Sequence, residues 1–117
     1  MGYNGGELVD SQFFEIIVYI NRNGDSPFYH WLNRNLDKST RARIRVRIDK
    51  LAIGHMGDHK FLGNGLYELR LAFGPGYRIY FSFIGKSIIL LLIGGNKSSQ
   101  SKDINFAIKL LKEFKER

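Results

Sequence analysis

The hydrophobic residues of this chain fall into short segments separated by polar or glycine-rich stretches. Aromatic and β-branched runs predict strands, and apolar residues at helical spacing predict helices. In chain order we expect a strand at 13–20, helices at 28–36 and from Asp37 or Ser39 to about 53, a glycine-rich loop at 54–65, strands at 66–73, 77–84 and 87–93, and a last helix capped by Ser101. This β-α-α-β-β-β-α order predicts the α+β class, with a curved, mainly antiparallel sheet and the helices packed on one face.

The segment Arg43–Asp49 fits two structures. Its strict alternation of arginine and apolar residues is typical of a strand. However, Ile44, Ile48 and Leu51 follow at i, i+4 and i+7, and Gly54 is a plausible helix stop. We therefore expect a helix that buries these three residues and exposes its arginines.

The stretch 65–81, GLYELRLAFGPGYRIYF, predicts a hairpin whose two faces differ in chemistry. If Phe73 pairs with Tyr77 across Gly74-Pro75-Gly76, then Arg70 lies opposite Tyr80 and Ala72 lies opposite Arg78. One face is then apolar and packs in the core: Leu69, Leu71, Ile79 and Phe81. The other, outward face groups ionisable side chains: Glu68, Arg70, Arg78 and Tyr80.

Two interpretations of this outward face remain open. Glu68 and Arg70 can form an ordinary surface pair that contributes about 0–1 kcal/mol. Alternatively, the two guanidinium groups, Arg70 and Arg78, can grip phosphate and stabilise charge in a transition state. Neighbouring cations would then lower the pKa of Tyr80 so that it can take a proton.

The formal net charge is +7. Seven basic residues and two acidic ones lie between Arg34 and Lys50, which indicates either a polyanionic partner or a well-solvated helix face. The candidate nucleic-acid-binding residues are Arg41, Arg45, Arg47, Lys50 and Lys102.

Several classes of protein are not indicated. The 117 residues predict one domain at 11–117 after a flexible segment at 1–10. There is no cysteine, no signal-peptide pattern, and the longest apolar run, Ile88–Ile93, is too short for a membrane span. His55 and His59 lack the partners of a zinc site. We expect a cytoplasmic protein without metal or small-molecule cofactor.

Two stretches carry a resemblance to a known family. GLYELRLAFGPGYRIYF followed by LLLIGGNKSSQSKDI, with the upstream basic segment STRARIRVRIDKL, resembles the RelE/ParE superfamily of bacterial toxins, and within it the HigB-like addiction module killer branch. The resemblance covers about Phe13 to Leu111. It implies a RelE-like fold and a toxin held inactive by a cognate antitoxin.

The resemblance also implies a reaction. RelE-like members cleave mRNA in the ribosomal A site without metal, by attack of a ribose 2′-hydroxyl on the adjacent phosphate. Arg78 matches the strand arginine of the family, Arg70 a second basic strand position, Lys60 a basic loop position, and Lys97 a basic position after the last strand. Because Asn96-Lys97-Ser98 replaces the usual histidine or tyrosine, proton transfer is expected from Tyr80, Lys97 or Glu68. The implied partners are an antitoxin, the ribosome and mRNA.

Two other functions remain open on this evidence. A ParE-type toxin shares the fold and inhibits DNA gyrase, and a non-catalytic protein would bind nucleic acid through the basic helix.

Overall fold

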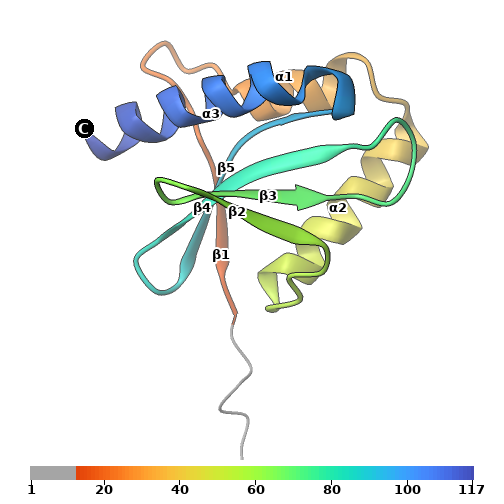
Figure 1. The fold of residues 1–117 in the computed structure, drawn as a ribbon, viewed down its shortest axis with the longest axis horizontal. Helices are drawn as coiled ribbons and strands as arrows, with labels where there is room; N and C mark the ends of the chain where they lie inside the picture. Colours follow the sequence, from red (N-terminus) through yellow and green to blue (C-terminus); the bar gives the residue numbers. More distant parts are fainter. Residues whose placement is uncertain (1–12) are drawn as a thin grey trace, which may run out of the picture.

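A computed structural model describes residues 13–117, and the segment predicted to be flexible, 1–10, lies outside that range. A five-stranded sheet forms the centre, in the order β1-β5-β4-β3-β2 (Figure 1). Its strands are β1 (Glu15–Val18), β2 (His59–Gly63), β3 (Leu66–Arg70), β4 (Arg78–Ile84) and β5 (Ile88–Gly95). The helices are α1 (Pro27–Arg34), α2 (Lys38–Ala52) and α3 (Gln100–Lys115), with a short 3-10 helix η2 (Lys97–Ser99) before α3.

The sheet is mainly antiparallel, as predicted, because only β1 pairs with its neighbour β5 in parallel. The α+β class is confirmed. No helix within residues 13–117 is long and apolar enough to cross a membrane.

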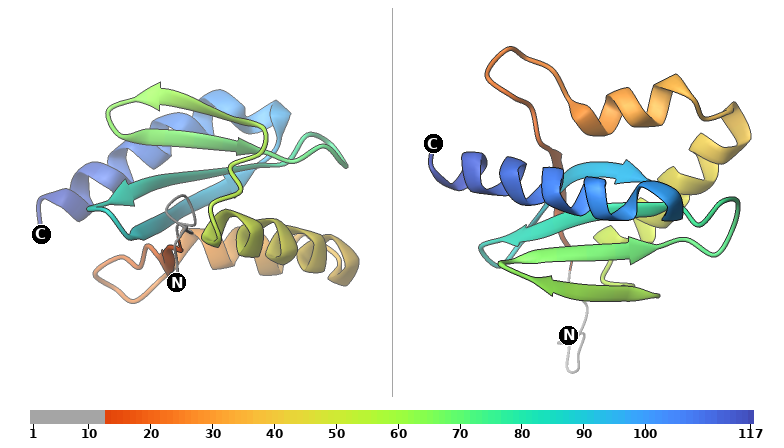
Figure 2. Two further views of the ribbon diagram at one scale, coloured as in Figure 1. Left: turned by 90° about the horizontal axis from the view of Figure 1, so that it is seen from below. Right: turned by 45° about the horizontal axis from the view of Figure 1, so that its top comes forward.

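The prediction that all helices pack on one face is wrong. Figure 2 shows α1 and α2 on one side of the sheet and α3 on the other. Leu69, Ile79 and Phe81 face α1 and α2, whereas Tyr80 and Leu90 face α3. Strands of this sheet are buried on both faces, so the alternation of apolar residues did not reveal that a helix also covers the more polar face.

Side chains at the helix starts cap both helices of one face, α1 and α2. Ser26 caps α1 by accepting a hydrogen bond from the Tyr29 amide, with Pro27 in the first turn. Asp37 caps α2 by accepting from the Thr40 amide at 2.8 Å. The segment Arg43–Asp49 lies within α2 and is helical, as predicted.

The start of α3 differs from the prediction. Ser99, rather than Ser101, is the N-cap residue, because the side chain of Asn96 organises the preceding turn η2. Asn96 Oδ1 accepts hydrogen bonds from the amides of Ser98 and Ser99 at 3.0 and 3.2 Å. Asp103 lies in the first turn of α3.

Strand β2 is absent from the prediction, which assigned residues 54–65 to a loop. Its sequence, HKFLG, has two large apolar residues and follows a glycine-rich stretch, so it carries no alternating pattern. The strand forms by pairing with β3, and the connection turns at Asn64, which has a positive φ of 53°. Tertiary pairing rather than local propensity therefore defines β2.

The predicted hairpin register is wrong by two residues, although the residues are divided correctly between the two faces. The face that was expected to point outward is covered by α3. Arg70 pairs with Arg78 and Glu68 pairs with Tyr80. The amide of Leu71 donates to the carbonyl of Tyr77, so the loop begins before Phe73. The rings of Phe73 and Tyr77 meet edge to face, with centroids 5.5 Å apart, instead of standing on a strand pair.

Candidate functional site

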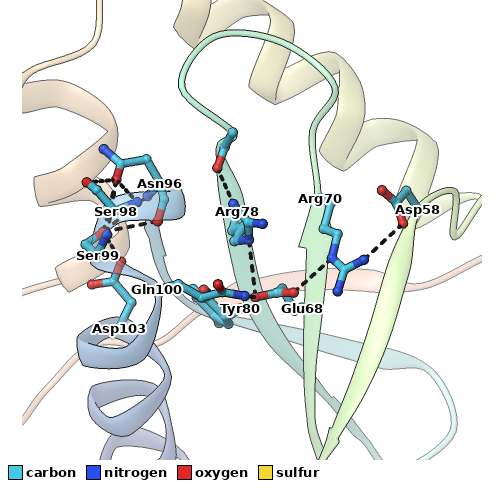
Figure 3. Close-up of polar contacts among 11 residues, drawn as sticks. Asp58, Glu68, Arg70, Arg78, Tyr80, Asn96, Ser98, Ser99, Gln100 and Asp103 are labelled. Carbon is cyan, nitrogen blue, oxygen red and sulfur yellow. Dashed lines mark hydrogen bonds and ion pairs between the residues drawn. The ribbon is translucent and has the colours of Figure 1, made fainter.

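Strands β3 and β4 bring four of the predicted site residues together. The register places Arg70 directly opposite Arg78, and Glu68 directly opposite Tyr80, on the sheet face that α3 covers. We call these four residues and Gln100 of α3 the Glu68 cluster (Figure 3). Adjacent like charges on paired strands are unfavourable, so this pair of arginines needs a compensating anion.

Glu68 supplies that anion. Its side chain has no exposed surface, and it accepts hydrogen bonds from Arg70 Nε at 3.0 Å, Tyr80 Oη at 3.1 Å and Gln100 Nε2 at 2.8 Å. Burial acts to raise the pKa of this carboxyl, but hydrogen bonds from Gln100, Arg70 and Tyr80 outweigh it and hold the pKa below its usual value. Glu68 is therefore a buried carboxylate that fixes the arginines.

Arg78 is the more enclosed of the two arginines, with its side chain 13% exposed. Its Nη1 donates to the Gly76 carbonyl at 2.7 Å, and its Nε lies 3.4 Å from Glu68 Oε2. That approach is an ion pair but not an aligned hydrogen bond. Within residues 13–117, Nε of Arg78 is the one buried side-chain nitrogen or oxygen without a hydrogen-bond partner. The guanidinium group of Arg78 is therefore positioned by the Gly76 carbonyl and by the charge of Glu68 rather than by a hydrogen bond from its Nε.

Arg70 lies nearer the surface, with its side chain 36% exposed. Besides Glu68, it has Asp58 as a second acidic neighbour, at 3.8 Å from Nη1. The carbonyl of Asp58 also accepts a hydrogen bond from the Arg70 amide. The guanidinium group is thus held on one side while its other side faces solvent.

The expectation for Tyr80 is wrong in its direction. Burial, followed by the charge and hydrogen bond of Glu68, raises the pKa of Tyr80, and the nearby cation Arg78 only partly offsets this. The tyrosine is fully buried beneath α3. The sequence suggested a solvent-facing tyrosine among cations, because it did not reveal the helix above it.

The predicted lysines lie around the Glu68 cluster without joining it. Lys60 stands opposite Glu68 on the edge strand β2, with its side chain exposed. Lys97 is exposed in η2, and it borders Gly76 together with Arg78: a Cβ atom built on Gly76 would lie 3.1 Å from Arg78 Nη1 and 3.3 Å from Lys97 Cβ. Lys102 is exposed on α3.

The basic residues of α2 divide into two groups. Arg41 and Arg47 are half-buried and are held by carbonyl groups, Arg41 by Leu36 and Arg47 by His55 and Met56. Arg45 and Lys50 are exposed. The helix and the end of β3 border a cavity of about 490 Å³ whose lining includes Val46, Arg47, Lys50, Arg70 and Phe73.

Two residues of the site were not predicted from the sequence to belong to it. Gln100 is part of the motif that supports the family resemblance, but only the position of α3 reveals that its amide reaches Glu68. Asp58 lies in the segment that was expected to be a loop. Among the described residues, no group of three or more histidine, cysteine or carboxylate side chains could hold a metal ion.

Comparison with known proteins defines the class of fold first. The fold resembles that of the E. coli toxin RelE, solved as a double arginine-to-alanine mutant in the free state. The TM-score is 0.57 at 18% sequence identity, over 85% of this chain and 96% of that chain. The chain therefore has a RelE-like fold.

The family follows from the sequence comparisons. A family model described as phage derived protein Gp49-like (DUF891) matches residues 31–113, so the chain belongs to the Gp49-like family. An uncharacterized protein of Haemophilus influenzae is 40% identical over 87 residues, which are 74% of this chain and 88% of the relative.

Proposed function

We propose that this protein is the toxin of a type II toxin–antitoxin system and acts in the cytoplasm as a ribosome-dependent mRNA endonuclease of the HigB-like branch. The RelE-like fold and the Gp49-like family support the proposal. The observation that carries it is the pair of opposed arginines, Arg70 and Arg78, which Glu68 holds side by side on one face of the sheet. Such a pair suits a phosphate group.

The proposed reaction is transesterification within RNA. The 2′-oxygen of a ribose attacks the adjacent phosphorus, the bond from phosphorus to the 5′-oxygen breaks, and the products are a 2′,3′-cyclic phosphate and a 5′-hydroxyl. Negative charge accumulates on the phosphoryl oxygens in the transition state. Arg78 and Arg70 would stabilise this charge, since both are fixed before substrate arrives.

Proton transfer is assigned to exposed side chains in this proposal. Glu68 is buried and bonded to three donors, and the pKa of Tyr80 is raised, so neither suits a mobile proton carrier. Lys97 is exposed beside Arg78 and would protonate the departing 5′-oxygen. The proton of the attacking 2′-hydroxyl would pass to solvent water. Lys60, at the edge of the sheet, would contact a neighbouring phosphate.

The exposed basic residues of α2 are proposed to meet the larger partners. Lys50, with Arg43 over the ring of Phe73, presents positive charge at the 490 Å³ cavity, and the exposed Arg45 lies on another side of α2. Either ribosomal RNA phosphates or an acidic antitoxin segment would complement this surface. Binding of either would weaken as salt concentration rises.

The test is induction of the chain in bacteria, with growth measurement and primer extension on several abundant mRNAs. We expect growth arrest and cuts that depend on active translation. Arg78→Ala should remove both. Arg117→Ala is the matched control, because it removes an arginine that also pairs with a glutamate but lies at the other end of the molecule.

Each outcome has a distinct meaning. Cuts that persist in soluble, folded Arg78→Ala protein would contradict the assigned role of the arginine pair. Growth arrest with intact mRNA and gyrase-linked DNA breaks would replace the proposal with gyrase inhibition. Salt-sensitive RNA binding without cleavage or growth arrest would indicate a binding protein.

A further inference from the structure

A second cavity, of about 280 Å³, lies between the end of α1, the Gly-Pro-Gly loop and the start of α3. The proposed catalytic cluster does not account for it. Its lining combines aromatic, amide and carboxylate side chains with backbone: Trp31, Asn35, Tyr77, Gly95, Asn96 and Asp103. This combination is typical of pockets for flat, polar ring systems such as nucleobases.

Trp31 and Tyr77 provide an aromatic wall. Their ring centroids are 6.2 Å apart, and the rings meet edge to face. Trp31 packs directly over Gly94, where an added Cβ would lie 2.2 Å from the indole. The glycine therefore allows the indole to lie against the strand at the border of the cavity.

Asp103 provides an incompletely satisfied acceptor. It is 8% exposed, and Ser99 Oγ donates to its Oδ2 at 2.5 Å. Within residues 13–117 its side chain has no other hydrogen-bond donor and no paired cation. A carboxylate has room for about four hydrogen bonds, so Asp103 can accept further donors.

The neighbouring backbone of β5 is open on one edge. Pairing of β1 with β5 ends at Val18 and Leu91, followed by a bond from the Tyr19 amide to the Leu91 carbonyl. Gly94 and Gly95 lie beyond that point. In the described part of the chain no strand pairs with this edge of β5 there.

The cavity adjoins the cationic side chains of the proposed site. Pro75 and Tyr77 line it, and Gly76 between them is flanked by Arg78 and Lys97. Figure 3 shows Asp103, Ser99 and Asn96 on one side of Arg78, with Glu68 and Arg70 on the other. A nucleotide with its base in the cavity would place its phosphate toward Arg78 and Lys97.

We propose that this cavity binds the guanine base of a single-stranded RNA nucleotide, with Asp103 accepting hydrogen bonds from the ring N–H and the exocyclic amino group. Among the common bases, guanine offers two adjacent donors to one carboxylate. Adenine and cytosine offer a single amino group, and uracil a single ring N–H. The inference rests on the proposed function, because it supplies that enzyme with a base preference at one position of its substrate.

The first experiment uses Trp31, which is the only tryptophan in the chain. Its indole N–H gives a single NMR resonance, which reports binding at the cavity wall. Titration with the four nucleoside 5′-monophosphates holds the phosphate constant. We expect the guanine nucleotide to shift the resonance at the lowest concentration, about tenfold below the others.

Inosine 5′-monophosphate lacks only the exocyclic amino group and should bind with intermediate affinity. An equal response to all nucleotides up to millimolar concentrations, or no response of Trp31, would overturn the inference. This comparison needs no variant, so it does not depend on whether a substitution disturbs the fold.

Asp103→Asn keeps the size of the side chain and removes the charge. The substitution should lower the affinity for the guanine nucleotide about tenfold and leave the affinities for the other nucleotides nearly unchanged. Asp49→Asn makes the same chemical change at an exposed position of α2 and should have no effect. Unchanged guanine preference in folded Asp103→Asn protein would contradict the assigned contact.

The inference and the proposed function fail separately. If the protein cleaves RNA but no nucleotide shifts the Trp31 resonance, the guanine-binding inference is wrong and the proposed nuclease function stands. If the protein binds guanine nucleotides selectively but never cleaves RNA, the guanine-binding inference stands and the proposed nuclease function is wrong.

Discussion

Two glutamate-centred clusters lie at opposite ends of the molecule and use nearly the same side chains. Glu68 contacts Arg70, Arg78 and Tyr80. Glu113, on α3, contacts Arg22, Arg117 and the hydroxyl of Tyr19. The side chain of Glu68 is fully buried, whereas that of Glu113 is 33% exposed.

The difference between the clusters lies in what their arginines do. Around Glu113 the partners join chain segments, since Arg117 donates both to Glu113 and to the Ile20 carbonyl at 2.6 Å. Around Glu68 the two arginines lie directly opposite each other on β3 and β4, and the exposed Lys60 and Lys97 lie nearby. Residue types alone therefore do not distinguish the two clusters; the burial of the glutamate and the pairing of two arginines across β3 and β4 do.

Replacing each glutamate in turn should give the largest difference in stability between the two clusters. Glu68→Ala leaves Arg78 enclosed without its counter-charge, so we expect a loss of about 3–5 kcal/mol in the free energy of unfolding. Glu113→Ala should cost clearly less, because water can replace the carboxylate. Urea denaturation measures both, and equal losses would remove the distinction.

Replacing the two tyrosines should give a smaller difference in stability between the clusters. Tyr80→Phe removes a buried hydrogen bond to a carboxylate and should destabilise the fold by about 1.5–3 kcal/mol. Tyr19→Phe should cost less, since Glu113 remains partly hydrated and keeps Arg117. If Tyr80 carries no proton in the reaction, folded Tyr80→Phe protein retains RNA cleavage; complete loss of cleavage would restore a catalytic role.

Acid should weaken both clusters. Hydrogen bonds from Arg117 and Tyr19 lower the pKa of Glu113 from 4.5 to about 2. Because the pKa is lower in the folded state, this contribution is present above pH 4.5 and is lost as pH falls toward 2. Glu113→Gln should therefore flatten the decline of the urea midpoint over that range, and an unchanged decline would contradict the assigned contacts.

The smallest effects concern the arginines of α2. Arg45→Ala should change stability by less than about 0.5 kcal/mol, because Arg45 is exposed and has no partner within residues 13–117. Arg47→Ala should cost more, since its guanidinium donates to the His55 and Met56 carbonyls. The reverse order in thermal unfolding would contradict this division of the basic residues.

The sequence predicts much of the fold because local signals agree with it. Caps at Ser26 and Asp37, and the alternation in β3 and β4, define the helix starts and the faces of the hairpin. Strand β2 and the placement of α3 depend on contacts distant in sequence, so no local pattern reveals them. Arg70, Arg78 and Glu68 could be predicted together because the alternation in β3 and β4 places them on one face. Gln100 and the burial of Tyr80 could not be predicted, because both depend on the position of α3.

The most direct test of the central claim is RNA cleavage by purified protein in a reconstituted translation system, with analysis of the new RNA ends. Wild-type protein and Arg117→Ala are expected to give 2′,3′-cyclic phosphate and 5′-hydroxyl ends. Arg78→Ala should cleave at least about a hundredfold more slowly. Equal cleavage by folded Arg78→Ala protein, or the absence of cleavage by wild type, would contradict the account.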